Sequence, residues 1–111
     1  MAGASGRYRL EGASADFFGS RIFRLIDRGT TVIGRFGRSG VIQGQPTDDA
    51  FEGEWTDRHR RGWLKLRFDP SFRFGECEYG TYGPGEVSRG RVSLSKIVRA
   101  PRPAKSIRSG E

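Results

Sequence analysis

The stretch Arg-Gly-Trp-Leu-Lys-Leu-Arg-Phe, residues 61–68, carries the strongest fold signal in this chain. Its apolar residues occupy every second position, and this set is Leu64, Leu66 and Phe68. The positions between them carry Trp63, Lys65 and Arg67. Side chains that alternate with a period of two lie on opposite faces of a β-strand. The stretch therefore predicts a strand with one buried face and one solvated face.

The same alternation recurs along most of the chain and predicts eight strands. They are Arg7–Glu11, Arg21–Asp27, Thr30–Phe36, Val41–Gly44, Ala50–Thr56, Arg61–Phe68, Ser71–Tyr79 and Arg89–Val98. The turn Asp27–Thr30 is expected to join the second strand to the third. Within Ser71–Tyr79 the apolar parity changes at Gly75, which predicts a β-bulge there. Gly12–Gly19 is the only helical candidate, and it is too short to be more than a turn or loop.

Chain length and glycine content favour a small all-β barrel. The 111 residues suffice for one domain, and 17 of them are glycine, which disfavours long helices and suits short strands with tight turns. Mostly short links between the strands predict an antiparallel up-and-down meander of seven or eight strands. Closing it into a barrel removes the exposed edges. The barrel domain is expected to span residues 6–98, and residues 99–111 are expected to form a disordered basic tail because they lack apolar periodicity.

The net charge of +7 is unevenly distributed along the sequence. Residues 1–86 carry 13 basic and 12 acidic side chains, whereas residues 87–111 carry seven basic side chains against Glu111 alone. Arginine supplies 17 of the 20 basic residues, and its planar guanidinium suits phosphate and carboxylate recognition. A GC-rich genome would produce the same bias without any function. Both interpretations remain open at this point.

Several protein classes are disfavoured by what the sequence lacks. Cys77 is the only cysteine, so no intrachain disulfide can form. No apolar run approaches the roughly 20 residues that a membrane-spanning helix needs, and the first residues lack the apolar core of a signal peptide. A cytoplasmic location is the resulting expectation.

The chemically reactive residues do not form a recognisable catalytic or metal-binding motif. Glu52 and Glu54 are expected to pair with Lys65 and Arg67 in a cross-strand charge ladder, in which Glu76 and Glu78 flank the same cations from the other side. His59 lies among arginines without a nucleophile, and Cys77 lies between two glutamates, which raise a thiol pKa. We therefore expect no enzyme activity, no metal and no cofactor.

Two resemblances follow from a recurring apolar–x–Gly–x–aromatic unit. The unit occurs as Val32-Ile33-Gly34-Arg35-Phe36 and as Phe51-Glu52-Gly53-Glu54-Trp55, and a Gly62-Trp63-led strand follows. In order and spacing, residues 6–98 resemble the avidin-like small β-barrels, which implies a ligand site at one open end. Leu10 stands where that family has a polar residue, so biotin binding is not implied. Phe51–Trp55 with Gly62 also resembles one MORN repeat.

A non-catalytic binding module, for a small ligand or a protein partner, is the function that these observations favour. Ligand contacts are expected in the barrel interior or mouth, at Phe36, Trp55, Phe68, Phe72, Tyr79 and Tyr82. The alternative is a nucleic-acid or polyanion-associated protein, with contacts at Arg58, Arg60, Arg61, Trp63, Arg67, Arg99, Arg102, Lys105 and Arg108. A structural or assembly protein is the third alternative, and the sequence does not rank partner identity or oligomeric state.

Overall fold

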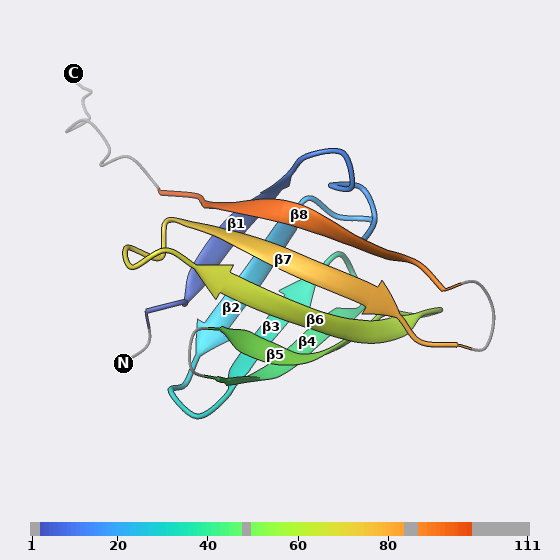
Figure 1. Cartoon of the computed structure of the whole chain (residues 1–111), viewed down its shortest axis with the longest axis horizontal. Helices are drawn as coiled ribbons and strands as arrows, with labels where there is room; N and C mark the ends of the chain where they lie inside the picture. The colour runs from blue at the N-terminus through green and yellow to red at the C-terminus, as the bar shows by residue number, and fades with distance from the viewer. Residues whose placement is uncertain (1–2, 48–49, 84–86, 99–111) are drawn as a thin grey trace, which may run out of the picture.

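Eight antiparallel strands form a closed barrel in the computed structural model, which describes residues 3–47, 50–83 and 87–98 (Figure 1). The strands are β1 (Gly6–Glu11), β2 (Ile22–Asp27), β3 (Val32–Phe36), β4 (Gly40–Pro46), β5 (Phe51–Thr56), β6 (Arg61–Phe68), β7 (Phe74–Thr81) and β8 (Arg89–Lys96). Each pairs with the next in sequence, and β8 returns to pair with β1. The described residues contain no helix, and the predicted all-β up-and-down barrel is confirmed. The predicted tail, 99–111, lies outside the described residues.

Two local predictions about strand ends are wrong. The pairing of β6 with β7 runs without interruption through Arg67–Glu76 and Phe68–Gly75, so no bulge lies at Gly75. The parity changes because residues 69–73 form the hairpin loop, where Phe72 has a φ of 59°. The turn after β2 is also longer than predicted, since Asp27 pairs with Val32 and β3 begins there.

The barrel interior is filled by side chains. The largest fully buried ones are Trp55, Tyr8, Phe23, Leu10, Ile42, Leu64, Leu66, Leu94, Val32, Val92 and Cys77. The Trp55 indole Nε1 donates a shared hydrogen bond to the carbonyls of Trp63, at 3.1 Å, and Gly80, at 3.2 Å. A Cβ on Gly62 would collide with the Gly80 carbonyl and lie 2.8 Å from that indole nitrogen, so glycine is needed here. The Gly-Trp spacing of the sequence thus reflects close packing of β5, β6 and β7.

The loop between β1 and β2 covers one end of the barrel. It consists of successive turns, with hydrogen bonds from Ala15 N to Gly12 O and from Gly19 N to Asp16 O, as the sequence predicted for this segment. Phe18 in this loop is buried, and its ring lies 5.2 Å from those of both Phe36 and Trp55. The loop therefore extends the aromatic core beyond the strands.

The opposite end is closed by the segment before β1. Tyr8 donates a hydrogen bond from its hydroxyl to Ala4 O at 2.9 Å, and the buried Asp27 carboxylate accepts one from Ala4 N at 3.1 Å. Burial, together with the negative charges of Asp27 and Asp69, raises the pKa of Tyr8 to about 12. With both ends covered, the surfaces open to a partner are the rims and the outer faces of the barrel.

Candidate functional site

The residues predicted to line an interior ligand site mostly contact one another. Phe36, Trp55 and Tyr79 are between 0% and 3% exposed and pack against the β1–β2 loop. Phe68 is half-buried at the opposite end, where its ring lies 5.6 Å from that of Phe72. A ligand would reach the first three only if the β1–β2 loop moved, and binding there stays a prediction. Tyr82 differs from the others because it is exposed on the rim.

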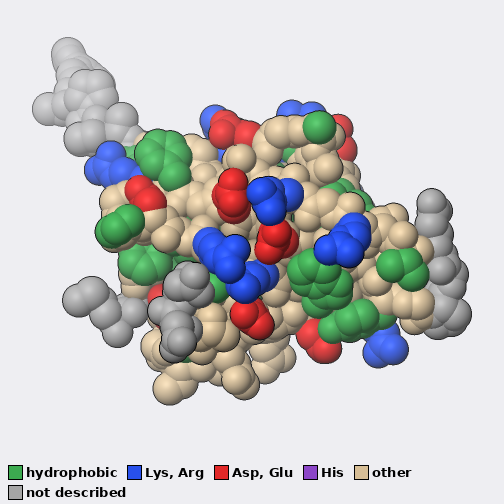
Figure 2. All heavy atoms as spheres, viewed as in Figure 1, with side chains coloured by type: hydrophobic (Ala, Val, Ile, Leu, Met, Phe, Trp, Pro, Cys, Tyr) green, Lys and Arg blue, Asp and Glu red, His purple; other side chains and the backbone are tan. Residues whose placement is uncertain are grey.

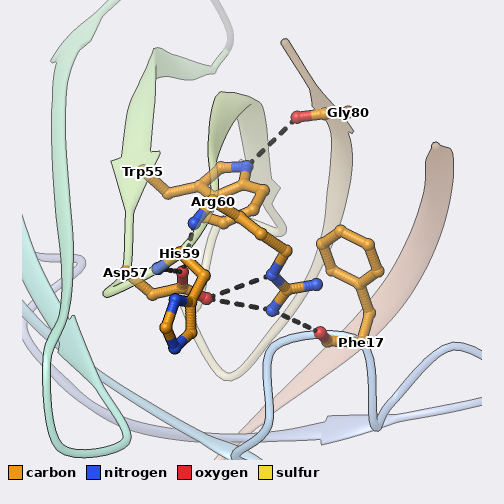
Figure 3. A network of polar contacts seen from close by, with 6 residues as sticks. All are labelled: Phe17, Trp55, Asp57, His59, Arg60 and Gly80. Atoms are coloured by element: carbon orange, nitrogen blue, oxygen red, sulfur yellow. Dashed lines mark hydrogen bonds and ion pairs between the residues drawn. The ribbon is translucent and has the colours of Figure 1, made fainter. Parts of the chain in front are cut away.

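Arg60, predicted to contact polyanions, instead ties two loops together (Figure 3). Its Nη2 lies 3.0 Å from Asp57 Oδ2 and donates to the Phe17 carbonyl at 2.9 Å. Its guanidinium also lies 4.6 Å from the centre of the Phe17 ring and 5.3 Å from that of Trp55. These contacts attach the β5–β6 turn to the loop that covers the barrel end. Arg60 therefore has a structural role, and its predicted contact with a polyanion stays a prediction.

Asp57 organises the same turn. Its Oδ1 accepts hydrogen bonds from the backbone N–H groups of His59, at 2.9 Å, and Arg60, at 2.7 Å. Burial disfavours the charged carboxylate, but these hydrogen bonds and the Arg60 guanidinium outweigh it, so the pKa of Asp57 lies below its ordinary value. The His59 side chain is exposed. These contacts hold the backbone of the β5–β6 turn in place.

A cleft of about 670 Å³ opens beside this turn, between the β5–β6 and β7–β8 connections. The Arg61 guanidinium lies 5.8 Å from the centre of the Tyr82 ring, and the Tyr82 hydroxyl donates to Glu54 Oε2 at 3.1 Å. Arg58 is exposed nearby on the β5–β6 turn, at the edge of a separate, smaller cleft. The predicted residues Arg61 and Tyr82 therefore lie together, whereas Phe68 and Phe72 lie at the other end of the barrel.

The predicted charge ladder covers the outer face of β5–β8. In this register Glu52 lies opposite Lys65, Lys65 opposite Glu78, and Glu78 opposite Arg91. Lys65 Nζ lies 3.4 Å from Glu52 Oε2, and Arg91 Nη2 lies 2.7 Å from Glu78 Oε2. Figure 2 shows the resulting interleaved positive and negative side chains at the centre of this face. The ladder interpretation is confirmed for Glu52 and Glu78, and Glu76 lies opposite Arg67 as predicted. It is wrong for Glu54, which lies opposite Trp63 and accepts a hydrogen bond from Tyr82.

Trp63 and Arg67, the predicted nucleic-acid platform, lie on this same ladder face. Trp63 points outward but is half-buried, because its indole packs against Gly80 of the neighbouring strand. Arg67 is exposed and lies opposite Glu76. The face around them carries both signs of charge. The remaining predicted contacts, Arg99, Arg102, Lys105 and Arg108, fall outside the described residues.

The outer face of β1–β3 has a different arrangement, which sequence reasoning missed. Arg7 on β1 lies directly opposite Arg24 on β2, and Arg24 lies directly opposite Arg35 on β3. All three side chains are exposed. Neighbouring strands are roughly 5 Å apart, so three like charges are held in one row across the sheet. We call Arg7, Arg24 and Arg35 the arginine row.

A groove of about 770 Å³ runs along this row. Besides the arginine row it is lined by Arg28 and Arg38 and by the aliphatic residues Ile22, Ile26 and Ile33. No Asp or Glu is among its described lining residues. Elsewhere in the barrel Arg60 and Arg91 form ion pairs with carboxylates. Within the described part of the chain, the five guanidiniums of the groove form no such ion pair or side-chain hydrogen bond. Five uncompensated cations therefore surround one hollow surface.

The remaining reactive side chains of the described residues do not form a catalytic or metal-binding group. Cys77 is buried, and burial together with the nearby Glu78 raises the pKa of its thiol. Among residues 3–47, 50–83 and 87–98, no three His, Cys, Asp or Glu side chains are grouped as metal ligands would be. Within the same ranges, no helix has the length and apolar character to cross a membrane.

Comparison with protein-family models, with curated proteins and with solved structures gave no match to this chain. The resemblances to avidin-like barrels and to a MORN repeat therefore stay predictions.

Proposed function

We propose that this chain is a non-catalytic binding module that recognises an anionic macromolecular partner through the outer face of β1–β3. The observation that carries the proposal is the arginine row, with Arg24 opposite both Arg7 and Arg35. Like charges directly opposite each other on neighbouring strands destabilise a sheet. An anionic partner that bridges the three guanidiniums converts this repulsion into attraction. Bidentate hydrogen bonds from arginine to carboxylate or phosphate add directional affinity.

The fold supports a scaffold role for the barrel. Its interior is packed with aromatic and aliphatic side chains, and both ends are covered. The sheet fixes the backbone positions of the three arginines, so little backbone order has to be gained on binding. The exposed cations of the groove and the filled interior together favour recognition on the outside of the barrel.

Binding of a flexible polyanion to the full chain tests this proposal. We suggest a fluorescein-labelled poly-glutamate peptide, with affinity measured by fluorescence anisotropy across a salt series. The double variant Arg24→Gln/Arg35→Gln should weaken binding by at least about tenfold and flatten the salt dependence, because two of the three row cations are lost. If this double variant binds the peptide as tightly as the wild type, the assignment of the arginine row as the binding site is refuted.

Two control variants that remove the same charge elsewhere show which part of the chain binds the peptide. Arg67→Gln/Arg91→Gln removes the same charge from the ladder face, where Arg91 is paired with Glu78, and should change affinity by less than about twofold. Arg102→Gln/Arg108→Gln removes the same charge from residues 99–111 at unchanged chain length. If only this last variant weakens binding, the affinity resides in that segment, as the polyanion alternative predicts, and not in the arginine row.

A further inference from the structure

Isoleucine side chains flank the arginine row on both sides. Ile22 and Ile26 lie two residues before and two residues after Arg24 on the same outer face of β2. Ile26 lies directly opposite Ile33 of β3, which also borders the groove. Ile22 is 38% exposed and Ile26 is 55% exposed. The face therefore presents the pair Ile26 and Ile33 on one side of the arginine row, and Ile22 on the other, where its neighbour on β1 is Arg9.

Exposed isoleucines beside arginines are not needed on a surface that binds a purely charged ligand. Exposed isoleucines between arginines increase the apolar surface in water and gain nothing from a purely charged ligand. The aliphatic stems of the arginines extend the same apolar surface toward their guanidiniums. A partner that covers the groove completely must therefore offer carboxylate or phosphate groups and aliphatic groups within one narrow segment.

We propose that the partner is an acidic protein segment in which carboxylate side chains alternate with aliphatic ones. This inference rests on the function proposed above and specifies its partner. The carboxylates pair with Arg7, Arg24 and Arg35, and the aliphatic side chains cover Ile22, Ile26 and Ile33. A hollow of about 770 Å³ has the size of a site for a few side chains of such a segment.

Other partners fit the face less well. Single-stranded nucleic acid is held largely by bases stacked on aromatic rings, and the aromatic residues of β1–β3, Tyr8, Phe23 and Phe36, are all buried in the core. A bilayer surface requires apolar groups that protrude, whereas these isoleucines line a groove between cations. The chain's own residues 99–111 carry four basic side chains against Glu111 alone, so their charge opposes the arginine row.

Two labelled peptides separate the contribution of charge from that of apolar contact. One consists of Glu-Gly-Ser repeats and the other of Glu-Gly-Leu repeats of equal length and charge. Both are titrated into the 111-residue chain near physiological salt, with dT-oligonucleotide and anionic phosphatidylserine vesicles as probes of the other partner classes. We expect the leucine peptide to bind at least about tenfold more tightly, because covering the exposed part of an isoleucine contributes about this factor.

The variant Ile26→Gln/Ile33→Gln provides the decisive comparison. It should remove the tenfold preference for the leucine peptide and leave binding of the serine peptide unchanged. Phe74→Gln is the control, since Phe74 is 60% exposed on β7, outside the groove, and its substitution should preserve the preference. Circular dichroism and thermal unfolding establish that each variant is folded before binding is compared.

The outcomes distinguish this inference from the proposed function. Equal affinity for the two peptides, both weakened by Arg24→Gln/Arg35→Gln, would overturn the acidic–aliphatic partner and leave anion binding intact. Tighter binding of the oligonucleotide or the vesicles than of the leucine peptide, insensitive to Ile26→Gln/Ile33→Gln, would also overturn it. Binding of neither peptide, or binding insensitive to the arginine row, would refute the proposed function itself.

Discussion

The two outer faces of this barrel use the same strand geometry with opposite charge patterns. Across β5–β8 one row of outward residues alternates in sign, through Glu52, Lys65, Glu78 and Arg91. Across β1–β3 the corresponding row consists of Arg7, Arg24 and Arg35. In the first row each residue has an opposite charge beside it, and in the second each has a like charge. The first arrangement stabilises the sheet, whereas the second is the one that we propose a partner covers.

The net charge of the chain does not reveal this difference between the two faces. Residues 1–86 have nearly equal numbers of acids and bases, which suggests a neutral surface without a binding face. The acids, however, are concentrated on β5–β7, where Glu52, Glu54, Glu76 and Glu78 occur, while the outward positions of β2 and β3 are arginine or isoleucine. A near-neutral domain can thus carry a strongly cationic groove, provided that register places its bases together.

The largest expected change in stability comes from a substitution that makes the charges across β1–β3 alternate in sign, as they do in the ladder on β5–β8. Arg24→Glu replaces two like-charge neighbours by two opposite-charge neighbours. With each cross-strand pair contributing roughly 0.2–1 kcal/mol, the free energy of unfolding should rise by about 1–2 kcal/mol, while poly-glutamate binding is lost. Urea unfolding followed by tryptophan fluorescence measures the first quantity. A variant that is less stable than the wild type would show that the arginine row is not a site of repulsion.

Replacing one arginine by glutamine on each face should change the free energy of unfolding by a smaller amount and in opposite directions. Arg24→Gln should raise the free energy of unfolding by roughly 0.2–1 kcal/mol, because it relieves repulsion from Arg7 and Arg35. Arg91→Gln should lower it, because it breaks the pair with Glu78 at 2.7 Å. Differential scanning calorimetry compares the two midpoints with that of the wild type. Shifts of the same sign in both variants would mean that the substitution acts through strand propensity, and the contrast between the faces would fail.

Much of the fold could be predicted from the sequence, because strand parity depends only on neighbouring residues. The alternation in residues 61–68 was sufficient to assign Leu64 and Leu66 to the core, and both are buried. The carboxylate ladder was predictable for the same reason, since short hairpins bring β5, β6 and β7 side by side. Parity alone likewise identifies Arg24 and Arg35 as outward residues.

The candidate site was missed because it depends on register. A turn at Asp27–Thr30 would pair Asp27 with Thr30 and place Arg24 opposite Ile33. The structure instead pairs Asp27 with Val32, which shifts Arg35 into line with Arg24. Arg7 joins the row through a connection of ten residues, 12–21, whose length leaves the register undetermined. The structural contact of Arg60 with Phe17 was missed for a similar reason, since it joins loops far apart in sequence.

Lowering the pH should also distinguish the two faces, because of the two only the ladder face is stabilised by ion pairs with carboxylates. The hydrogen bond from Arg91 and the adjacent positive charges hold the pKa of Glu78 below its ordinary value. A depressed pKa in the folded state means that the stabilisation is present above the unfolded value of about 4.3 and is lost as pH falls through the folded value. Arg91→Gln should therefore show a smaller loss of unfolding free energy than the wild type between about pH 6 and pH 3. Arg24→Gln should lose as much as the wild type, and an equally reduced loss in both variants would contradict this assignment.

Salt should produce the smallest effect and test the physical cause of the contrast. Charges on neighbouring strands interact appreciably at low ionic strength, whereas at about 1 M salt the screening length falls to about 3 Å. The stability gain of Arg24→Gln and the stability loss of Arg91→Gln should both shrink as NaCl is added, so that the two variants converge on the wild type from opposite sides. Urea unfolding at each salt concentration measures both differences. If the gain of Arg24→Gln persists in high salt, side-chain packing on β2 accounts for it, and the arginine row stores no electrostatic repulsion for a partner to relieve.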